Sequence, residues 1–77
     1  MLDPIVVGNV IQRFREEKKM TQEVLSGFAA IGRTHLSAIE RGIRRPTMET
    51  FCRIAEAMCV TPSELLSAIE EEMDRRE

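Results

Sequence analysis

A complete capping box, Thr61-Pro62-Ser63-Glu64, marks the start of a helix in the last quarter of the chain. Threonine followed three residues later by glutamate satisfies free N–H groups at a helix N-terminus, and proline is favoured at the first helical position. The residues that follow give this helix an apolar side that faces a core or a partner: Leu65, Leu66, Ile69 and Met73.

Four earlier segments show the same helical pattern. Asp3 followed by Pro4 is typical of an N-cap and a first helical position, and Thr21 and Thr47 are typical N-caps further along. Between the caps, apolar residues recur at intervals of three and four, and no stretch alternates strictly enough for a strand. We predict an all-α, compact five-helix bundle, with helices from Pro4 to about Lys18, from Thr21, from Arg33 to about Arg41, from Thr47 and from Thr61.

The size of the chain limits what it can contain. Its 77 residues make one small domain, 1–77, in which the charge-dense residues 70–77 are expected to fray. Apolar runs are too short for a membrane span and no basic leader precedes them, so we expect a cytoplasmic protein. Two cysteines seven residues apart and a single histidine do not provide a zinc site. We expect no metal, cofactor or small-molecule ligand.

Charge is distributed unevenly along the chain. The formal net charge is −2, but residues 67–77 hold five acidic side chains against two arginines. Residues 31–46 hold four arginines against one glutamate. The positive charge is therefore local, and the net charge conceals it.

A helix over 33–41 has two different sides at 100° per residue. Leu36 and Ile39, with Ile43 just beyond, point to the core, as Leu25, Phe28 and Ala29 do on the preceding helix. Small side chains let the opposite side approach another surface closely, and a guanidinium group can bind phosphate or the O6 and N7 atoms of guanine. That side carries small residues with arginines at both ends: Arg33, Thr34, Ser37, Ala38 and Arg41.

These features, taken in order, resemble the helix-turn-helix domain of the Cro/cI-type (Xre) transcriptional regulators. The resemblance runs from about Phe14 to Leu66, and the segment RTHLSAIERGIRRP also looks like the small controller proteins of restriction–modification systems. The motifs that carry it are Thr21-Gln22-Glu23, Ile39-Glu40-Arg41-Gly42, Pro46-Thr47, Glu49-Thr50 and Thr61-Pro62-Ser63-Glu64-Leu65.

The resemblance implies a lambda-repressor-like fold whose third helix enters the major groove of duplex DNA N-terminus first. It places Arg33, Thr34 and Ala38 toward the bases, and His35 and Ser37 nearer the groove walls. It also implies a salt bridge between Arg15 and Glu40. Phosphate contacts are implied for Gln22, Arg41, Arg44 and Arg45.

Three positions depart from the family pattern. Ala30 stands where the turn before the third helix usually has glycine, so either alanine tolerates a strained backbone or the turn differs. Gly32 replaces the usual Ser or Thr N-cap and leaves that helix end open for a phosphate. Cys59 occupies a C-cap where glycine is favoured, and we predict a left-handed backbone there.

The sequence as a whole predicts a homodimeric transcriptional regulator that binds a palindromic double-stranded DNA operator. Leu65, Ile69 and Met73 are the predicted dimer contact, because they extend past what a five-helix core needs. The alternative is a protein-interaction module, such as an antitoxin, that binds a partner through the fifth helix or the acidic tail. We expect no enzyme, because there is no glycine-rich phosphate loop and the lone histidine has no free carboxylate partner at helical spacing.

Overall fold

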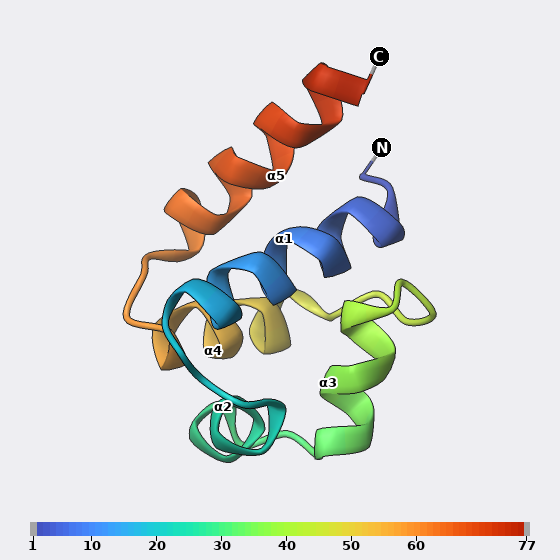
Figure 1. Cartoon of the computed structure of the whole chain (residues 1–77). Coiled ribbons are helices and arrows are strands. Elements are labelled where there is room, and N and C mark those ends of the chain that lie inside the picture. Colours follow the sequence, from blue (N-terminus) through green and yellow to red (C-terminus); the bar gives the residue numbers. More distant parts are fainter. Residues whose placement is uncertain (1, 77) are drawn as a thin grey trace.

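The computed structural model describes residues 2–76. Within them the chain forms five helices and no strand, which confirms the predicted all-α fold (Figure 1). The helices are α1 (Pro4–Glu17), α2 (Gln22–Ala29), α3 (Arg33–Glu40), α4 (Met48–Ala57) and α5 (Pro62–Arg76).

The helices begin where the caps in the sequence predict. Asp3, Thr21 and Thr47 each accept a hydrogen bond from a backbone N–H in the first turn of α1, α2 and α4. At α5 the exchange is reciprocal: Thr61 Oγ1 accepts from the Glu64 N–H at 3.1 Å, and Glu64 Oε1 accepts from the Thr61 N–H at 3.0 Å. The bond from this backbone N–H holds the pKa of the Glu64 carboxyl below its usual value. The capping box is confirmed.

Helices α1 to α4 all end in a Schellman motif. In each, the N–H of a left-handed residue bonds the carbonyl three residues back, and the next N–H bonds the carbonyl five back. Alanine, cysteine or lysine in this conformation costs about 1 kcal/mol relative to glycine. The positive φ predicted for Cys59 is confirmed, and Ala30 adopts the strained backbone. The positive φ of Lys19 was not predicted. The four left-handed residues are Lys19, Ala30, Gly42 and Cys59.

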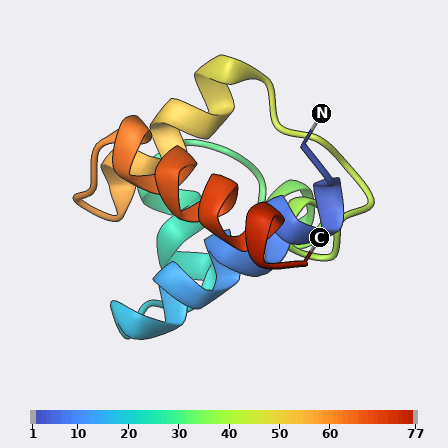
Figure 2. The ribbon, with the colours of Figure 1, turned by 90° about the horizontal axis from the view of Figure 1, so that it is seen from above.

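One apolar cluster lies at the centre of the five helices. Helix α1 contacts α3 and α5, while α2 contacts α3 and α4. Seen from above, α5 lies beside α1 (Figure 2). Every helix therefore contributes to a single core, whose largest fully buried side chains are Val6, Val10, Ile11, Leu25, Leu36, Ile39, Ile54, Met58, Leu65 and Ile69.

Two residues predicted to face the core do not. Phe28 is 73% exposed and Ile43 is 66% exposed. The buried side of α2 is centred on Leu25, Ser26 and Ala29, so Phe28 lies to one side of it. Ile43 lies outside α3, because the left-handed backbone of Gly42 ends the helical spacing before it.

The acidic segment near the C-terminus is ordered. Residues 70–76, which were expected to fray, continue α5, and Glu77 lies outside the described residues. Glu72 accepts a hydrogen bond from Arg76 Nε at 3.0 Å and lies 3.8 Å from Arg13 Nη1 of α1. These contacts join Glu72 to the last turn of α5 and to α1.

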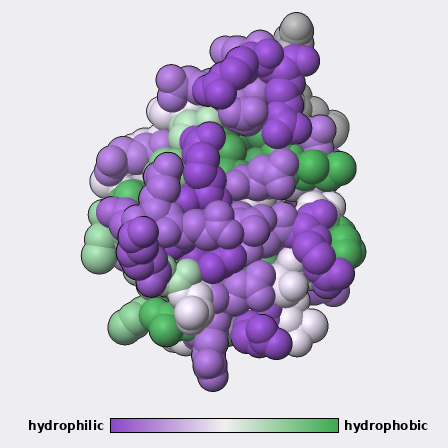
Figure 3. Space-filling view, viewed as in Figure 1, coloured by the Kyte–Doolittle hydropathy of each residue, from purple (hydrophilic) through white to green (hydrophobic). Residues whose placement is uncertain are grey.

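The surface seen in the view of Figure 1 is mostly hydrophilic, with smaller apolar areas between the charged groups (Figure 3). The longest helix, α5, has 15 residues and ends in charged side chains. Among the described residues, no helix has the length and apolar character needed to cross a bilayer.

Candidate nucleic-acid interface

Helices α2 and α3 are joined by the tight turn 30–32. The Schellman bonds from Ala30 to Gly27 and from Ile31 to Ser26 close the end of α2. Gly32 then has an extended backbone, with φ −71° and ψ 147°, and caps α3. This turn leaves the two helices in contact and directs the N-terminus of α3 away from the core.

The N-terminus of α3 is open. Gly32 is exposed, provides no side-chain cap, and has no other part of the chain within 4 Å of where a Cβ would lie. The N–H groups of the first helical turn have no acceptor within the helix, so they are available to an anion. The structure thus agrees with the predicted cap position at Gly32.

The outward side of α3 has the predicted character. Arg33, Thr34 and Arg41 are exposed, whereas Leu36 and Ile39 are fully buried. Between these extremes, three small or medium side chains are half-buried along the edge of the exposed side: His35, Ser37 and Ala38. The exposed side therefore carries no bulky apolar group and has a guanidinium group at each end.

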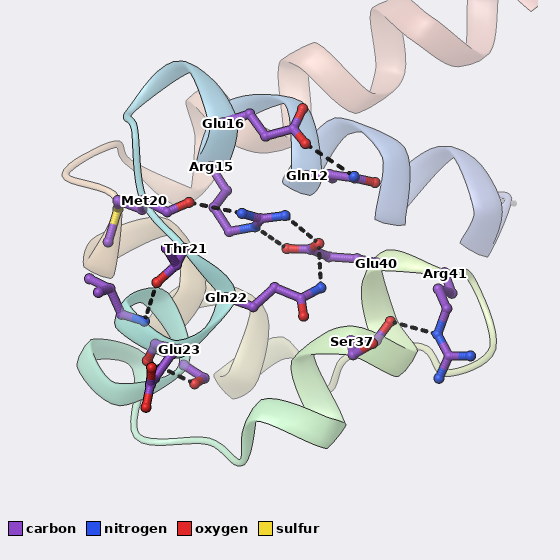
Figure 4. Close-up of polar contacts among 12 residues, drawn as sticks. Gln12, Arg15, Glu16, Met20, Thr21, Gln22, Glu23, Ser37, Glu40 and Arg41 are labelled. Atoms are coloured by element: carbon purple, nitrogen blue, oxygen red, sulfur yellow. Dashed lines mark hydrogen bonds and ion pairs between the residues drawn. The ribbon is translucent and has the colours of Figure 1, made fainter.

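A buried polar network fixes α3 against α1 and α2 (Figure 4). Arg15 Nε donates to Glu40 Oε2 at 2.7 Å and Arg15 Nη2 donates to Glu40 Oε1 at 3.0 Å, which forms the expected salt bridge. Arg15 Nη1 donates to the carbonyl of Met20, in the segment between α1 and α2, at 2.8 Å. The fork geometry of arginine thus joins three segments of the chain through one side chain.

The surroundings of Arg15 favour its charged form. Glu40 is only 4% exposed and Arg15 is buried beside it. The hydrogen bond to Glu40 raises the pKa of Arg15 above its usual value, and this effect outweighs the burial that lowers it. Every buried side-chain nitrogen and oxygen in the described residues has a hydrogen-bond partner. The network therefore positions the helices, and no charge in it is left over for a ligand.

Gln22 belongs to this network as well as to the exposed end of α2. Its Nε2 donates to Glu40 Oε1 at 3.0 Å. An amide nitrogen has two hydrogens, so one remains for a phosphate after this bond is made. The sequence did not predict the bond to Glu40, because the two residues are 18 positions apart.

The three arginines that follow α3 differ in their partners. Arg41 Nε lies 3.4 Å from the carbonyl of Ser37, a long bond that leaves its guanidinium group at the surface (Figure 4). Arg45 Nη1 donates to the carbonyl of Leu2 at 2.8 Å, so this residue is bound to the N-terminal segment. Arg44 is exposed, and within residues 2–76 its backbone N–H bonds the carbonyl of Ala38 while its side chain makes no hydrogen bond or ion pair.

The predicted dimer contact on α5 is wrong for two of its three residues. Leu65 and Ile69 are 0% exposed, because the core of a single chain needs both of them. Met73 is half-buried and packs against the same core. No side chain of Leu65 or Ile69 is left to meet another molecule.

A different apolar surface is available. A groove of about 520 Å³ lies between the N-terminal segment, the chain before α4, and the first turns of α4 and α5. We call it the α4–α5 groove. Met48 is 86% exposed at its edge. Its apolar lining includes Leu2, Val7, Pro46, Met48, Phe51 and Leu66.

Comparison with known proteins gives a consistent result. The family model described as Helix-turn-helix matches residues 11–65. The chain is 36% identical over 66 residues to an HTH-type transcriptional regulator, y4dJ, of Sinorhizobium fredii, with 86% of each chain covered. It is 35% identical over 66 residues to the control protein C.MunI of a Mycoplasma species, with 84% of this chain and 89% of that protein covered.

Solved structures extend the likeness to the whole chain. The restriction–modification controller protein C.Esp1396I is 29% identical, with a TM-score of 0.88 and 97% of each chain covered. The same controller as a tetramer in complex with its natural 35-base-pair operator has a TM-score of 0.85 at 30% identity, covering 94% of this chain and 95% of that one. The described helices therefore have the arrangement of a protein whose structure includes its DNA.

Proposed function

The chain belongs to the helix-turn-helix family, and on that premise we propose that it is a transcriptional regulator that binds double-stranded DNA sequence-specifically as a homodimer. One observation carries the proposal: α3 presents an open N-terminus and a small-residue side, and the buried Arg15–Glu40–Gln22 network holds it in place. A helix presented in this way can enter the major groove, which is about 12 Å wide.

Within that groove each residue of α3 has a proposed role. Arg33 lies at the first helical position and would donate two hydrogen bonds to a guanine. Thr34 and Ala38 would lie against base edges, where a methyl group can contact thymine. His35 and Ser37, at the half-buried edge, would lie along the groove walls.

Phosphate contacts would flank the recognition helix. Arg41 and Arg44 are exposed beside the C-terminal end of α3, and the second amide hydrogen of Gln22 lies at the start of α2. Such contacts fix the register of a protein on the duplex and make its affinity depend on salt.

The α4–α5 groove is the proposed dimer surface, in place of the stripe on α5. Its lining includes Arg45 to Met48, directly after Arg44 in the segment that follows α3. A two-fold axis beside this segment would leave both copies of α3 on the same side of the dimer. Two such helices bind half-sites about 34 Å apart, one turn of the duplex, so a palindromic operator is expected.

The likeness to control proteins supports a narrower proposal. C.MunI and C.Esp1396I are control or controller proteins, and the latter binds an operator. We infer that this chain is a regulator of the same kind, present in the cytoplasm and without catalytic activity, and that residues 1–77 act as one DNA-binding domain. The antitoxin alternative, which used the fifth helix or the acidic tail, is not favoured: the relatives are transcriptional regulators, and Leu65 and Ile69 of α5 are buried.

The experiment is equilibrium binding to two labelled duplexes, one from upstream of the protein's own gene and one with the same bases shuffled. We expect preference for the first duplex and affinity that falls steeply with salt. Arg33→Ala should weaken specific binding by about 1–3 kcal/mol and relax one base position. Arg75→Ala, in the last turn of α5, is the control and should change neither the specific affinity nor the base preference. Equal binding of both duplexes by the wild-type protein would contradict the proposal.

A further inference from the structure

Arg45 and Arg44 are adjacent in the sequence but differently placed. Arg45 Nη1 donates to the backbone carbonyl of Leu2 at 2.8 Å, across 43 positions of the chain. The guanidinium group of Arg44 has no hydrogen-bond or ion-pair partner in the part of the chain that the structure describes. Only Arg44 therefore has its full set of donors free for phosphate.

Arg45 is also part of the α4–α5 groove. It is the one charged residue in the lining of a surface that is otherwise apolar or uncharged. The carbonyl that it binds belongs to Leu2, which lies in the same lining beside Pro46 and Leu66. The bond from Arg45 thus holds Leu2 at the N-terminal side of the groove. The next residue, Asp3, is held by its cap on α1.

The occupant of this groove is a second copy of the chain. The groove has exposed apolar side chains with no acidic residue in its lining, and Met48 at its edge is the most exposed large apolar residue described. The proposed function requires a dimer, and this groove is an exposed apolar surface that remains for it once Leu65 and Ile69 are buried in the core.

We propose that Arg45 is a positioning residue of the dimer surface: it holds Leu2 in the wall of the α4–α5 groove and is not a phosphate ligand. Terminal residues are poorly ordered unless something ties them down, and an interface that is ordered before association binds more tightly. This inference rests on the proposed DNA-binding dimer. It corrects the phosphate role that the sequence predicted for Arg45.

The test compares Arg45→Ala with Arg44→Ala by two measurements. In sedimentation equilibrium without DNA, Arg45→Ala should weaken dimerisation about fivefold to tenfold, the effect expected for one exposed hydrogen bond, while Arg44→Ala should leave it unchanged. In DNA binding at protein concentrations that keep the dimer intact, Arg44→Ala should reduce the slope of log affinity against log salt by about one per monomer. Arg45→Ala should keep the wild-type slope.

Two further variants separate the possible failures. Leu2→Ala should weaken dimerisation, and its effect together with Arg45→Ala should be less than additive, because both disturb the same wall. Met48→Glu should prevent dimerisation if the groove is the interface. Normal dimerisation by Met48→Glu would overturn the interface within the proposed function. Loss of dimerisation in Met48→Glu, with an unchanged dimer constant and a reduced salt slope in Arg45→Ala, would overturn the role of Arg45 alone.

Discussion

Two arginine–glutamate pairs, one buried between α1 and α3 and one at the surface near the end of α5, have different effects on the fold. Arg15 and Glu40 join α1 to α3 with a 2.7 Å contact between side chains that are 11% and 2% exposed. Arg76 and Glu72 lie 3.0 Å apart near the end of α5, with side chains 48% and 14% exposed. Distance alone does not distinguish them. Burial does, because water screens the second pair and cannot replace a lost partner in the first.

The largest expected difference in the free energy of unfolding follows from removing the glutamate of each pair. Glu40→Ala leaves Arg15 buried without its partner and should lower the free energy of unfolding by about 3–5 kcal/mol. Glu72→Ala should lower it far less, because water screens the pair at the surface. Urea unfolding of both variants measures the contrast. If Glu40→Ala is too unstable to measure, Glu40→Gln can replace it, because glutamine keeps an acceptor oxygen. Its free energy of unfolding is expected to lie between those of Glu40→Ala and Glu72→Ala.

A smaller effect on stability is expected at the turn between α2 and α3. Ala30→Gly relieves the left-handed alanine and should raise stability by about 0.5–1 kcal/mol, which is the strain released less the extra entropy of unfolded glycine. Ala29→Gly is the control. It removes a buried methyl group from the end of α2 and should lower stability. Thermal unfolding of both compares them, and equal shifts in the same direction would show that the turn is not strained.

The smallest effect is expected at the exposed end of α5. The hydrogen bond from Arg76 lowers the pKa of the Glu72 carboxyl, with Arg75 and Arg13 adding to it. The stabilisation that Glu72 provides is therefore complete above the pKa of an unfolded glutamate. It disappears as the pH falls through the lowered pKa of Glu72 in the folded protein.

Glu72→Gln should remove this part of the acid sensitivity, and added salt should shrink the difference from wild type. Melting temperatures across the acidic range, at low and high salt, measure it. A loss of stability as large as that caused by Glu40→Ala would contradict the contrast between the buried pair and the surface pair.

Local chemistry explains why so much of the fold could be predicted. The capping box of Thr61 and Glu64 lies within four residues, so the sequence alone shows which groups form its hydrogen bonds. The positive φ at Cys59 was predicted because the family resemblance places a C-cap that favours glycine there, and a Schellman motif needs a left-handed residue at that position.

The errors arose where spacing alone cannot say what a side chain meets. Leu65 and Ile69 have the spacing of an apolar side, but spacing does not tell a core from a partner. The bonds from Gln22 to Glu40 and from Arg45 to Leu2 join residues far apart in the sequence, and only the folded chain brings them together. These long-range contacts decide which polar side chains remain free for DNA.

The central claim is that α3 of each copy in a dimer contacts specific bases. Selection of binding sites from a pool of randomised duplexes tests it directly, because the selected sequences report what the protein recognises. The account predicts an inverted repeat with half-site centres about 34 Å apart, and loss of one base preference in each half when Arg33→Ala is selected in parallel. Selected duplexes with no shared sequence, or a single half-site without its repeat, would contradict it.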